Sequence, residues 1–252
     1  FFQFAFSQER LQRQTSEFEK LFAGGGMAVS GEMYEKFCTY AELLCERNEQ
    51  VNLTAITDPE GIALKHFYDS VYPFTLIDVP RGTSLIDVGT GAGFPSVPLT
   101  IYRPDIRLTL LDSLNKRVNF LQELTSALGI EAECIHARAE EAARSIKGGN
   151  PLRGGFDMAC ARAVANLRDL CEYCLPFVKV GGAFTALKGR DGAEELAAAE
   201  NAIKLLGGET ELCREYALPN GDARTLIVIR KVKPTAEKYP RCSAQMKKKP
   251  LV

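Results

Sequence analysis

Short apolar segments alternate with helical patterns from residue 84 to residue 206, and this alternation restricts the possible folds more than any other feature. Parallel strands need a crossover of about a dozen residues or more, which a helix of this length supplies. A parallel sheet also needs helices on both faces. We therefore predict a doubly wound, Rossmann-like α/β fold. The expected strands are Ser84–Val88, Arg107–Asp112, Glu133–His136, Phe156–Ala161 and Ala183–Lys188.

Two further segments, Glu209–Ala217 and Arg224–Lys231, alternate apolar and polar residues and have no long helix between them. We expect them to form a hairpin at the sheet edge, with one strand antiparallel. The complete sheet should then have about seven strands. The helices expected between and after the first five strands lie near Phe94–Tyr102, Leu114–Leu128, Ala139–Lys147, Leu167–Val178 and Ala193–Leu206.

The part of the chain before the first strand shows helical patterns only. Three glycines at 24–26 should stop a first helix. Ser30 and Asp58 each precede a new helical pattern, and both residue types are favoured N-caps. The three expected helices are Gln8–Phe22, Glu32–Glu46 and Pro59 to about Tyr72.

These patterns divide the chain into an N-terminal helical region (1–80), an α/β domain (81–232) and a basic C-terminal tail (233–252). The net charge of the whole chain is −1, but it is unevenly distributed. From Arg230 onward, eight basic residues stand against one acid, Glu237, so this stretch carries +7 and the rest carries −8. A basic tail of this kind is typical of a segment that binds nucleic acid or of a solvated end.

The chain has 8 cysteines, but a fold with a large core does not need disulfides, so we expect reduced thiols. Cys171 and Cys174 could lie on one helix face, with a redox or metal role as the alternative. No second Cys/His pair stands nearby to complete four zinc ligands. The apolar start, with Phe at positions 1, 2, 4 and 6, is too short for a membrane span or a signal core. We expect a cytoplasmic protein.

A glycine-rich turn, Asp87-Val88-Gly89-Thr90-Gly91-Ala92-Gly93-Phe94-Pro95, follows the first expected strand. In a doubly wound sheet, ligands bind at the carboxyl ends of the strands. Glycines let the chain bend sharply and let a ligand approach closely. Asp112 ends the next strand, where a carboxylate can accept hydrogen bonds from both ribose hydroxyls of an adenosine. We therefore predict an adenosine-bearing ligand at Gly89, Gly91, Gly93 and Asp112.

The spacing of the glycines is G-x-G-x-G, whereas the dinucleotide fingerprint is G-x-G-x-x-G. A dinucleotide enzyme needs this turn to hold a pyrophosphate, and Asp87 would repel one. S-adenosylmethionine has no phosphate and carries cationic groups that suit Asp87. The turn therefore favours an S-adenosylmethionine-dependent methyltransferase with a class I sheet. A tight strand–helix turn without a ligand is the alternative.

Several motifs together resemble the bacterial glucose-inhibited division protein B family, the small-subunit ribosomal RNA methyltransferase G enzymes. The resemblance extends over nearly the whole chain from about Tyr34, and the α/β domain would then be the methyltransferase domain. The motifs are Asn52-Leu53-Thr54-Ala55-Ile56, Lys65-His66-Phe67-Tyr68-Asp69-Ser70, Asp87 to Pro95, Asp112-Ser113-Leu114-Asn115-Lys116-Arg117, Arg138-Ala139-Glu140, Ala161-Arg162-Ala163-Val164, Ala186-Leu187-Lys188-Gly189 and Lys238-Tyr239-Pro240-Arg241.

The resemblance implies that the chain methylates N7 of a guanine in 16S ribosomal RNA and uses S-adenosyl-L-methionine. It also implies that Gly89, Phe94, Ala139, Glu140 and Arg162 contact this cofactor. Glu140 could instead be an acid that suits the first turn of a helix. The chain departs from the family after Arg241, where the usual Lys-x-Gly-x-Pro is missing.

Guanine N7 has a lone pair and no proton, so we expect no catalytic base or nucleophile. The residues agree, because Ala161-Arg162-Ala163-Val164 stands where amine methyltransferases carry Asn/Asp-Pro-Pro-Tyr/Phe. Cys160 is expected to be buried rather than nucleophilic. Arg162 stays protonated and cannot act as a base. An arginine on guanine N7 would block the attacking atom, so we favour contact of Arg162 with the cofactor or a phosphate.

RNA affinity depends on neutralised phosphates, so basic residues should contact the substrate, which is 16S RNA or the 30S particle. We expect a monomer that needs neither a metal nor a membrane. For Asn52, His66 and Asp69 the alternative interpretation is structural. His66 would then be a core or capping residue, and Asn52 and Asp69 would have turn or capping roles. Two competing functions are a small-molecule methyltransferase of the same fold and a non-catalytic RNA-binding module of ribosome assembly. The candidate substrate residues are Asn52, His66, Lys188, Lys238 and Arg241, with Lys247–Lys249 in the tail.

Overall fold

One seven-stranded sheet forms the centre of the computed structural model, which describes residues 8–162 and 165–251, with side chains from residue 16. The strand order is β3-β2-β1-β4-β5-β7-β6. The first five strands run parallel, and β7 is antiparallel to both of its neighbours, as predicted for the hairpin. The strands are β1 (Ser84–Val88), β2 (Arg107–Asp112), β3 (Ala132–His136), β4 (Phe156–Arg162), β5 (Val178–Lys188), β6 (Gly208–Ala217) and β7 (Ala223–Lys231).

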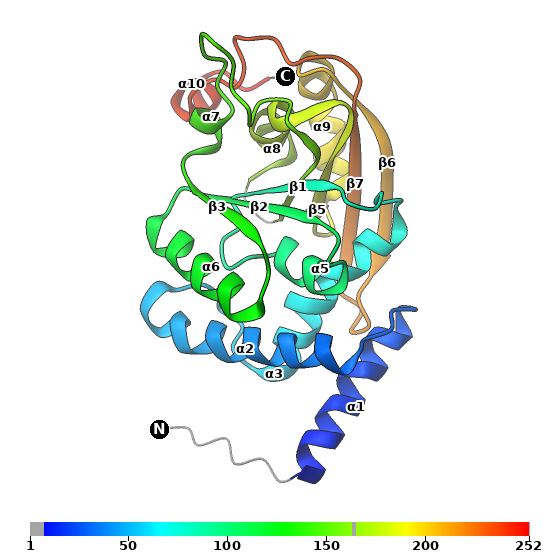
Figure 1. Cartoon of the computed structure of the whole chain (residues 1–252). Coiled ribbons are helices and arrows are strands. Elements are labelled where there is room, and N and C mark those ends of the chain that lie inside the picture. The colour runs from blue at the N-terminus through cyan, green and yellow to red at the C-terminus, as the bar shows by residue number, and fades with distance from the viewer. Residues whose placement is uncertain (1–7, 163–164, 252) are drawn as a thin grey trace.

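Helices cover both faces of this sheet, and each face has its own apolar core (Figure 1). Alternate residues of β1 divide between them, with Leu85 in the first core and Ile86 in the second. The first face carries α1 (Gln8–Gly24), α2 (Gly31–Val51), α5 (Ser96–Tyr102) and α6 (Asn115–Leu128). The second carries α7 (Ala139–Ala142), α8 (Leu167–Cys174), α9 (Gly192–Leu205) and the C-terminal α10 (Ser243–Lys248).

α2 begins where the sequence predicts and ends later. The Ser30 hydroxyl accepts a hydrogen bond from the Met33 amide, at 3.2 Å, and caps the first turn. The helix was expected to end at Glu46 but continues to Val51. It ends there because Asn52 adopts the left-handed conformation, with φ of 52°, which asparagine tolerates better than most residues.

The predicted helix from Pro59 to Tyr72 is helical throughout but not a regular α-helix. Asp58 caps α3 (Pro59–Gly61) by accepting a hydrogen bond from the Gly61 amide at 2.7 Å. The chain then forms a π-helix, η1 (Ile62–Tyr68), a single turn α4 (Asp69–Val71) and a 3₁₀ turn η2 (Tyr72–Leu76). All six residues from 66 to 71 are buried, so this segment is covered on all sides rather than on one helical face.

Three further expectations for individual elements are wrong. The helix expected over Ala139–Lys147 is only α7, because side chains of the following loop take its last carbonyl groups. β5 begins at Val178 rather than Ala183, since Gly182 lets it pass close to the Asp157 carbonyl. A Cβ on Gly182 would lie 2.4 Å from that oxygen. The helix expected to reach Val178 ends as α8 and a 3₁₀ turn, η3 (Leu175–Phe177), in which Pro176 cannot continue the helix.

The C-terminal segment is packed rather than free. Tyr239, Met246 and Leu251 are buried, and Tyr239 and Leu251 belong to the second core. The helices within the described part of the chain include none that is long and apolar enough to cross a membrane. The Phe-rich start and residues Ala163 and Val164 of one motif lie outside the described residues.

Candidate active site

The glycine-rich turn is anchored to the end of β2 on one side and to α2 on the other. The Gly89 amide donates to the Leu111 carbonyl at 2.8 Å. Gly93 has a φ of 101°, and a Cβ there would lie 2.7 Å from the Tyr40 hydroxyl. Gly91, with a φ of 61°, has open space beside it within the described structure. The early third glycine is therefore explained by the close approach of Tyr40, while Gly91 leaves an approach for a ligand.

Asp87 lies fully buried beneath this turn. One carboxylate oxygen, Oδ2, accepts hydrogen bonds from the hydroxyls of Thr90 (2.9 Å) and Ser96 (2.6 Å). The other, Oδ1, is buried and has no partner in the described structure. Burial raises the pKa of Asp87 to about 6, although the bonds from Ser96 and Thr90 oppose this rise. An orphaned carboxylate oxygen of this kind fits a ligand that brings a positively charged group.

Asp112 ties the glycine-rich turn to the end of β2. Its Oδ2 accepts a 3.0 Å hydrogen bond from the Gly91 amide, and its Oδ1 accepts one of 2.9 Å from the Leu114 amide. Arg117 lies 3.7 Å from the same carboxylate. Each oxygen retains a second lone pair. The predicted contact of Asp112 with the ribose hydroxyls is compatible with this arrangement and stays a prediction.

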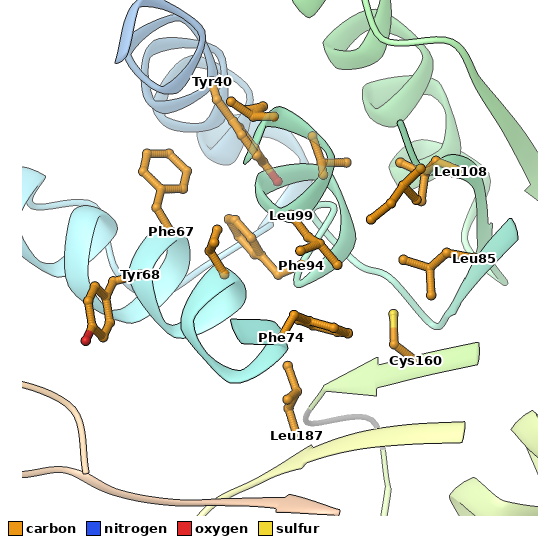
Figure 2. Packing of buried hydrophobic residues seen from close by; sticks show 14 of the residues in the cluster. Tyr40, Phe67, Tyr68, Phe74, Leu85, Phe94, Leu99, Leu108, Cys160 and Leu187 are labelled. Atoms are coloured by element: carbon orange, nitrogen blue, oxygen red, sulfur yellow. The ribbon is translucent and has the colours of Figure 1, made fainter. Parts of the chain in front are cut away.

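Side chains from three distant parts of the chain meet the ring of Phe94. His66 stacks on it, with ring centres 4.4 Å apart and planes at 15°. Tyr40 also stacks on it, at 5.4 Å and 13°, and Figure 2 shows Tyr40 reaching toward Phe94 from α2. The guanidinium carbon of Arg162 lies 4.9 Å from the ring centre. Phe94 and Arg162, predicted for the cofactor, and His66, predicted for RNA, therefore lie together.

His66 is a neutral residue in this cluster. Burial lowers its pKa to about 4, and the nearby charge of Arg162 adds to this effect. Its Nε2 lies 2.7 Å from the Thr54 hydroxyl, whose oxygen also accepts the Ile56 amide at 3.0 Å. Thr54 can therefore donate its proton to Nε2, which leaves the imidazole proton on Nδ1. Nδ1 is buried, and among the described residues no group meets it with hydrogen-bond geometry. The Lys65 backbone nevertheless opposes the lowering of the pKa.

Arg162 ends β4 and is held by the segment that follows α3. Its Nη1 donates to the Lys65 carbonyl and to the Ser70 hydroxyl, each at 3.2 Å. Burial lowers its pKa and the negative charge of Asp69 opposes this. Asp69 is itself paired with Arg224 of β7 at 2.9 Å. The hydrogen bonds that fix the guanidinium thus go to neutral groups, and its contact with an anionic group of a ligand stays a prediction.

Ala139 and Glu140 form the first turn of α7, directly after β3. The Ala137 amide donates to the Asp112 carbonyl at 3.2 Å, which fixes this turn beside the end of β2. Glu140 is buried. Because β3, β2, β1 and β4 are neighbours and parallel, their carboxyl ends place Glu140, Asp112, Asp87 and Arg162 along one sheet edge.

Comparison with known proteins identifies the family. The model for "rRNA small subunit methyltransferase G" matches residues 33–220. The chain belongs to this family. It is 46% identical over 228 residues to ribosomal RNA small subunit methyltransferase G of Clostridium perfringens, covering 90% of this chain and 94% of that protein. It is 45% identical over 240 residues to the enzyme of the same name from Lactobacillus johnsonii, covering 93% and 98%.

The fold and the cofactor follow from this membership. The family resemblance, the class I methyltransferase sheet and S-adenosylmethionine as cofactor are confirmed. A chain solved in complex with the Haloferax volcanii methyltransferase activator Trm112 has the same fold, with a TM-score of 0.53. It shares 13% sequence identity, and the match covers 70% of this chain and 94% of that one.

The candidate RNA residues of the methyltransferase are not gathered in one place. Lys188 donates to the Ala165 carbonyl (2.9 Å) and pairs with Glu195 (2.8 Å), so it joins the loop after β4 to α9. Arg241 pairs with the buried Glu172 of α8. Lys238 lies 5.2 Å above the ring of Tyr239, which packs in the second core, whereas His66 stacks on Phe94 of the first. Asn52 ends α2 and is exposed.

Several residues of the site were not predicted from the sequence. Tyr40 bonds to the Ala92 carbonyl, and Thr54 bonds to His66. Ser70 accepts a hydrogen bond from Arg162, and Arg224 of β7 reaches Asp69. Thr54 and Ser70 belong to two of the family motifs, which is a usable signal. For Tyr40 the sequence gives no such signal, apart from its place in an apolar helical stripe. In the described residues no group of three or more His, Cys, Asp or Glu is arranged to hold a metal ion.

Proposed function

We propose that this chain transfers the methyl group of S-adenosylmethionine to N7 of a guanine in 16S ribosomal RNA. The observation that carries this proposal is the orphaned carboxylate oxygen of Asp87 beneath an open glycine turn, in line with Asp112 and Arg162. The names of the relatives support ribosomal RNA of the small subunit as the substrate. We further propose that the chain works in the cytoplasm, where such RNA is found.

The order of the strands suggests how the cofactor is held. We assign Asp87 to its ammonium group, Asp112 to its ribose hydroxyls and Ala139–Glu140 to its adenine end. Asp87 and Asp112 lie at the carboxyl ends of β1 and β2, and Ala139–Glu140 come shortly after β3. Arg162, at the end of β4, is assigned to the cofactor carboxylate or to an RNA phosphate. When bound, the cofactor supplies a methyl group on a positively charged sulfur. Gly89, Gly91 and Phe94 shape the remaining wall.

The proposed reaction needs no proton transfer from the protein. Guanine N7 offers its lone pair directly, so the side chains only have to orient the base and exclude water. His66 fits this role, because with a pKa of about 4 it stays neutral and is a weak base. Cys160 is fully buried and its thiol pKa is raised by burial, so it is a poor nucleophile. Both residues are therefore consistent with a reaction in which the protein only positions the base and the cofactor.

Phosphate binding is assigned to the exposed lysines of the C-terminal segment, Lys238 and Lys247–Lys249. Lys188 and Arg241 contribute to the site by holding neighbouring segments, since both already pair with carboxylates of the chain. The methyltransferase is proposed to act on this RNA as a monomer. Naked RNA and the 30S particle are the two forms in which the substrate is offered in the test.

The test is to incubate the protein with methyl-labelled S-adenosylmethionine and, separately, unmodified 16S RNA, 30S particles lacking the modification, and a metabolite extract. We expect label in the RNA of at least one of the first two samples. Label only in small molecules would support the alternative enzyme of the same fold. Cofactor binding by calorimetry without label in any sample would support a non-catalytic RNA-binding module.

A further inference from the structure

The C-terminal segment, residues 233–251, is fastened to the second face at its start. The Lys231 ammonium donates to the Leu175 carbonyl and to the Thr235 hydroxyl. Thr235 in turn donates to the Leu206 carbonyl at 2.7 Å. Lys231 is buried, and burial lowers its pKa to about 7. A lysine held in this way marks a fixed contact and not a flexible tail.

The far end of the segment is fastened by Arg241. Its Nε and Nη2 donate to the two carboxylate oxygens of Glu172, at 2.8 and 2.6 Å, and its own backbone amide donates to Oε1 at 2.8 Å. Its Nη1 donates to the Lys249 carbonyl at 2.6 Å, just after α10. Glu172 is 1% exposed, so this two-pronged ion pair is shielded from water on the acid side. The segment is therefore anchored at both ends.

Between these anchors, Arg153 joins the segment to α7. Its Nη1 donates to the carbonyls of Tyr239 (2.7 Å) and Ala143 (2.8 Å). Its Nη2 donates to the carbonyls of Thr235 (2.8 Å) and Ala236 (3.1 Å). Three of the four acceptors belong to the C-terminal segment, and the fourth is the residue that follows α7. One guanidinium therefore connects the end of the chain to the element that carries Ala139 and Glu140.

α7 needs such support because it has only four residues, 139–142. A helix this short is not stable by itself in water. Its end is held by side chains from the next loop: the Asn150 amide group donates to the carbonyls of Ala142 (2.7 Å) and Arg144 (2.9 Å), and Arg153 donates to that of Ala143. Ala143 is fully buried. The position of α7 thus depends on where Arg153 is held.

We propose that Arg153 is a positioning residue through which the C-terminal segment fixes α7 against the adenine end of the cofactor. This inference rests on the proposed function, since it takes Ala139–Glu140 as part of the cofactor site. Without the segment, Arg153 would have only one of its four acceptors, the Ala143 carbonyl. No other contact of the segment would then orient the guanidinium toward this carbonyl. The C-terminal segment then has a second role besides supplying lysines for RNA. By holding α7 in place through Arg153, the segment raises the affinity for the cofactor.

The test compares Arg153→Lys with the matched control Arg214→Lys, at an exposed arginine on β6. Lysine keeps the charge but cannot reach four carbonyls at once. Binding of S-adenosylhomocysteine is measured by calorimetry at a temperature where circular dichroism shows each variant fully folded. Hydrogen exchange of the amides of residues 141–144 is measured on the same samples. A second variant, Arg241→Lys, weakens the far anchor and leaves Arg153 unchanged, in case Arg153→Lys does not fold.

We expect Arg153→Lys to weaken binding about tenfold, which is the loss of about one net hydrogen bond, and to speed exchange at 141–144. Arg241→Lys should act in the same direction and Arg214→Lys should change neither. A lower melting temperature with unchanged affinity would mean that Arg153 only stabilises the fold, and would overturn the inference. Glu140→Ala is measured in parallel. If it also leaves affinity unchanged, the placement of the cofactor at α7 fails, and the inference fails with it.

Discussion

The Tyr40 hydroxyl donates a 2.6 Å hydrogen bond to the carbonyl of Ala92, the residue between the second and third glycines of the turn. Tyr40 is fully buried on α2, so this bond joins the N-terminal helices directly to the glycine-rich turn. Gly93 makes the approach possible, because any side chain there would meet the same hydroxyl. The N-terminal helices are thus part of the wall of the site.

We expect Tyr40→Phe to lower the free energy of unfolding by about 1–3 kcal/mol, because the buried Ala92 carbonyl loses its donor while the ring contacts remain. Urea unfolding measures this change, and cofactor binding should weaken in the same variant. Tyr72→Phe, in a neighbouring aromatic pair, is the matched control. Equal unfolding midpoints for Tyr40→Phe and the unaltered protein would contradict the role given to this bond.

Asp87→Asn should make the ligand-free protein more stable at neutral pH. The pKa of Asp87 is raised from 3.8 to about 6, so the folded state binds more protons than the unfolded state between these pH values. The free energy of unfolding therefore falls as pH rises through this window, by about 3 kcal/mol from this group. Asparagine removes the buried charge and keeps an acceptor for Ser96 and Thr90. Unfolding of both proteins at pH 4, 5, 6 and 7 should show the difference growing toward pH 7.

Cofactor affinity should also depend on the carboxylate of Asp87. A bound ammonium group favours ionised Asp87, so binding of S-adenosylhomocysteine should tighten as pH rises through about 6 and should release a proton there. Calorimetry in buffers of different ionisation enthalpy measures that proton. Asp87→Asn should weaken binding and abolish the pH dependence. A proton release that persists in Asp87→Asn would assign it to another group.

Only part of this site could be predicted from the sequence. The glycine-rich turn, Asp87 and Asp112 are local patterns at strand ends, so their positions follow once the sheet is predicted. Tyr40 and Arg224 meet the site through tertiary contacts over long sequence separations, which no local pattern encodes. Arg241 was predicted to contact RNA because it stands in a basic tail, whereas its guanidinium pairs with Glu172, 69 residues away. Likewise, the helical pattern at 139–147 could not show that loop side chains end α7 early.

Removing the carboxylate of Glu172, the partner of Arg241, should free the C-terminal segment. Glu172→Ala leaves Arg241 without its partner and should destabilise the fold by about 3 kcal/mol, since breaking one side of a buried pair leaves a charge uncompensated. Trypsin should then cut faster at the lysines of α10 than in the unaltered protein, as followed by mass spectrometry. The control is Glu209→Ala, at an exposed acid on β6. Equal cutting rates would show that the pair of Arg241 with Glu172 does not hold the end of this segment.

The exposed lysines at 247–249 should control the salt dependence of RNA binding. Replacing all three with Gln should weaken binding and lower the slope of log affinity against log salt by up to about 3, roughly one for each phosphate that is no longer neutralised. Filter binding with 16S RNA at several salt concentrations measures the slope. The same variant should keep its affinity for S-adenosylhomocysteine, which separates RNA binding from the positioning by Arg153. A salt slope equal to that of the unaltered protein would exclude these lysines from the interface.

The proposed attack by guanine N7 is tested most directly by identifying the methylated atom. RNA treated with the protein and methyl-labelled cofactor is digested to nucleosides and separated by liquid chromatography with mass spectrometry. We predict that the label is found in 7-methylguanosine, and that Asp112→Ala lowers its amount by weakening cofactor binding. Label in another nucleoside, or in guanosine methylated at an exocyclic atom or the ribose, would contradict direct attack by N7 in this site.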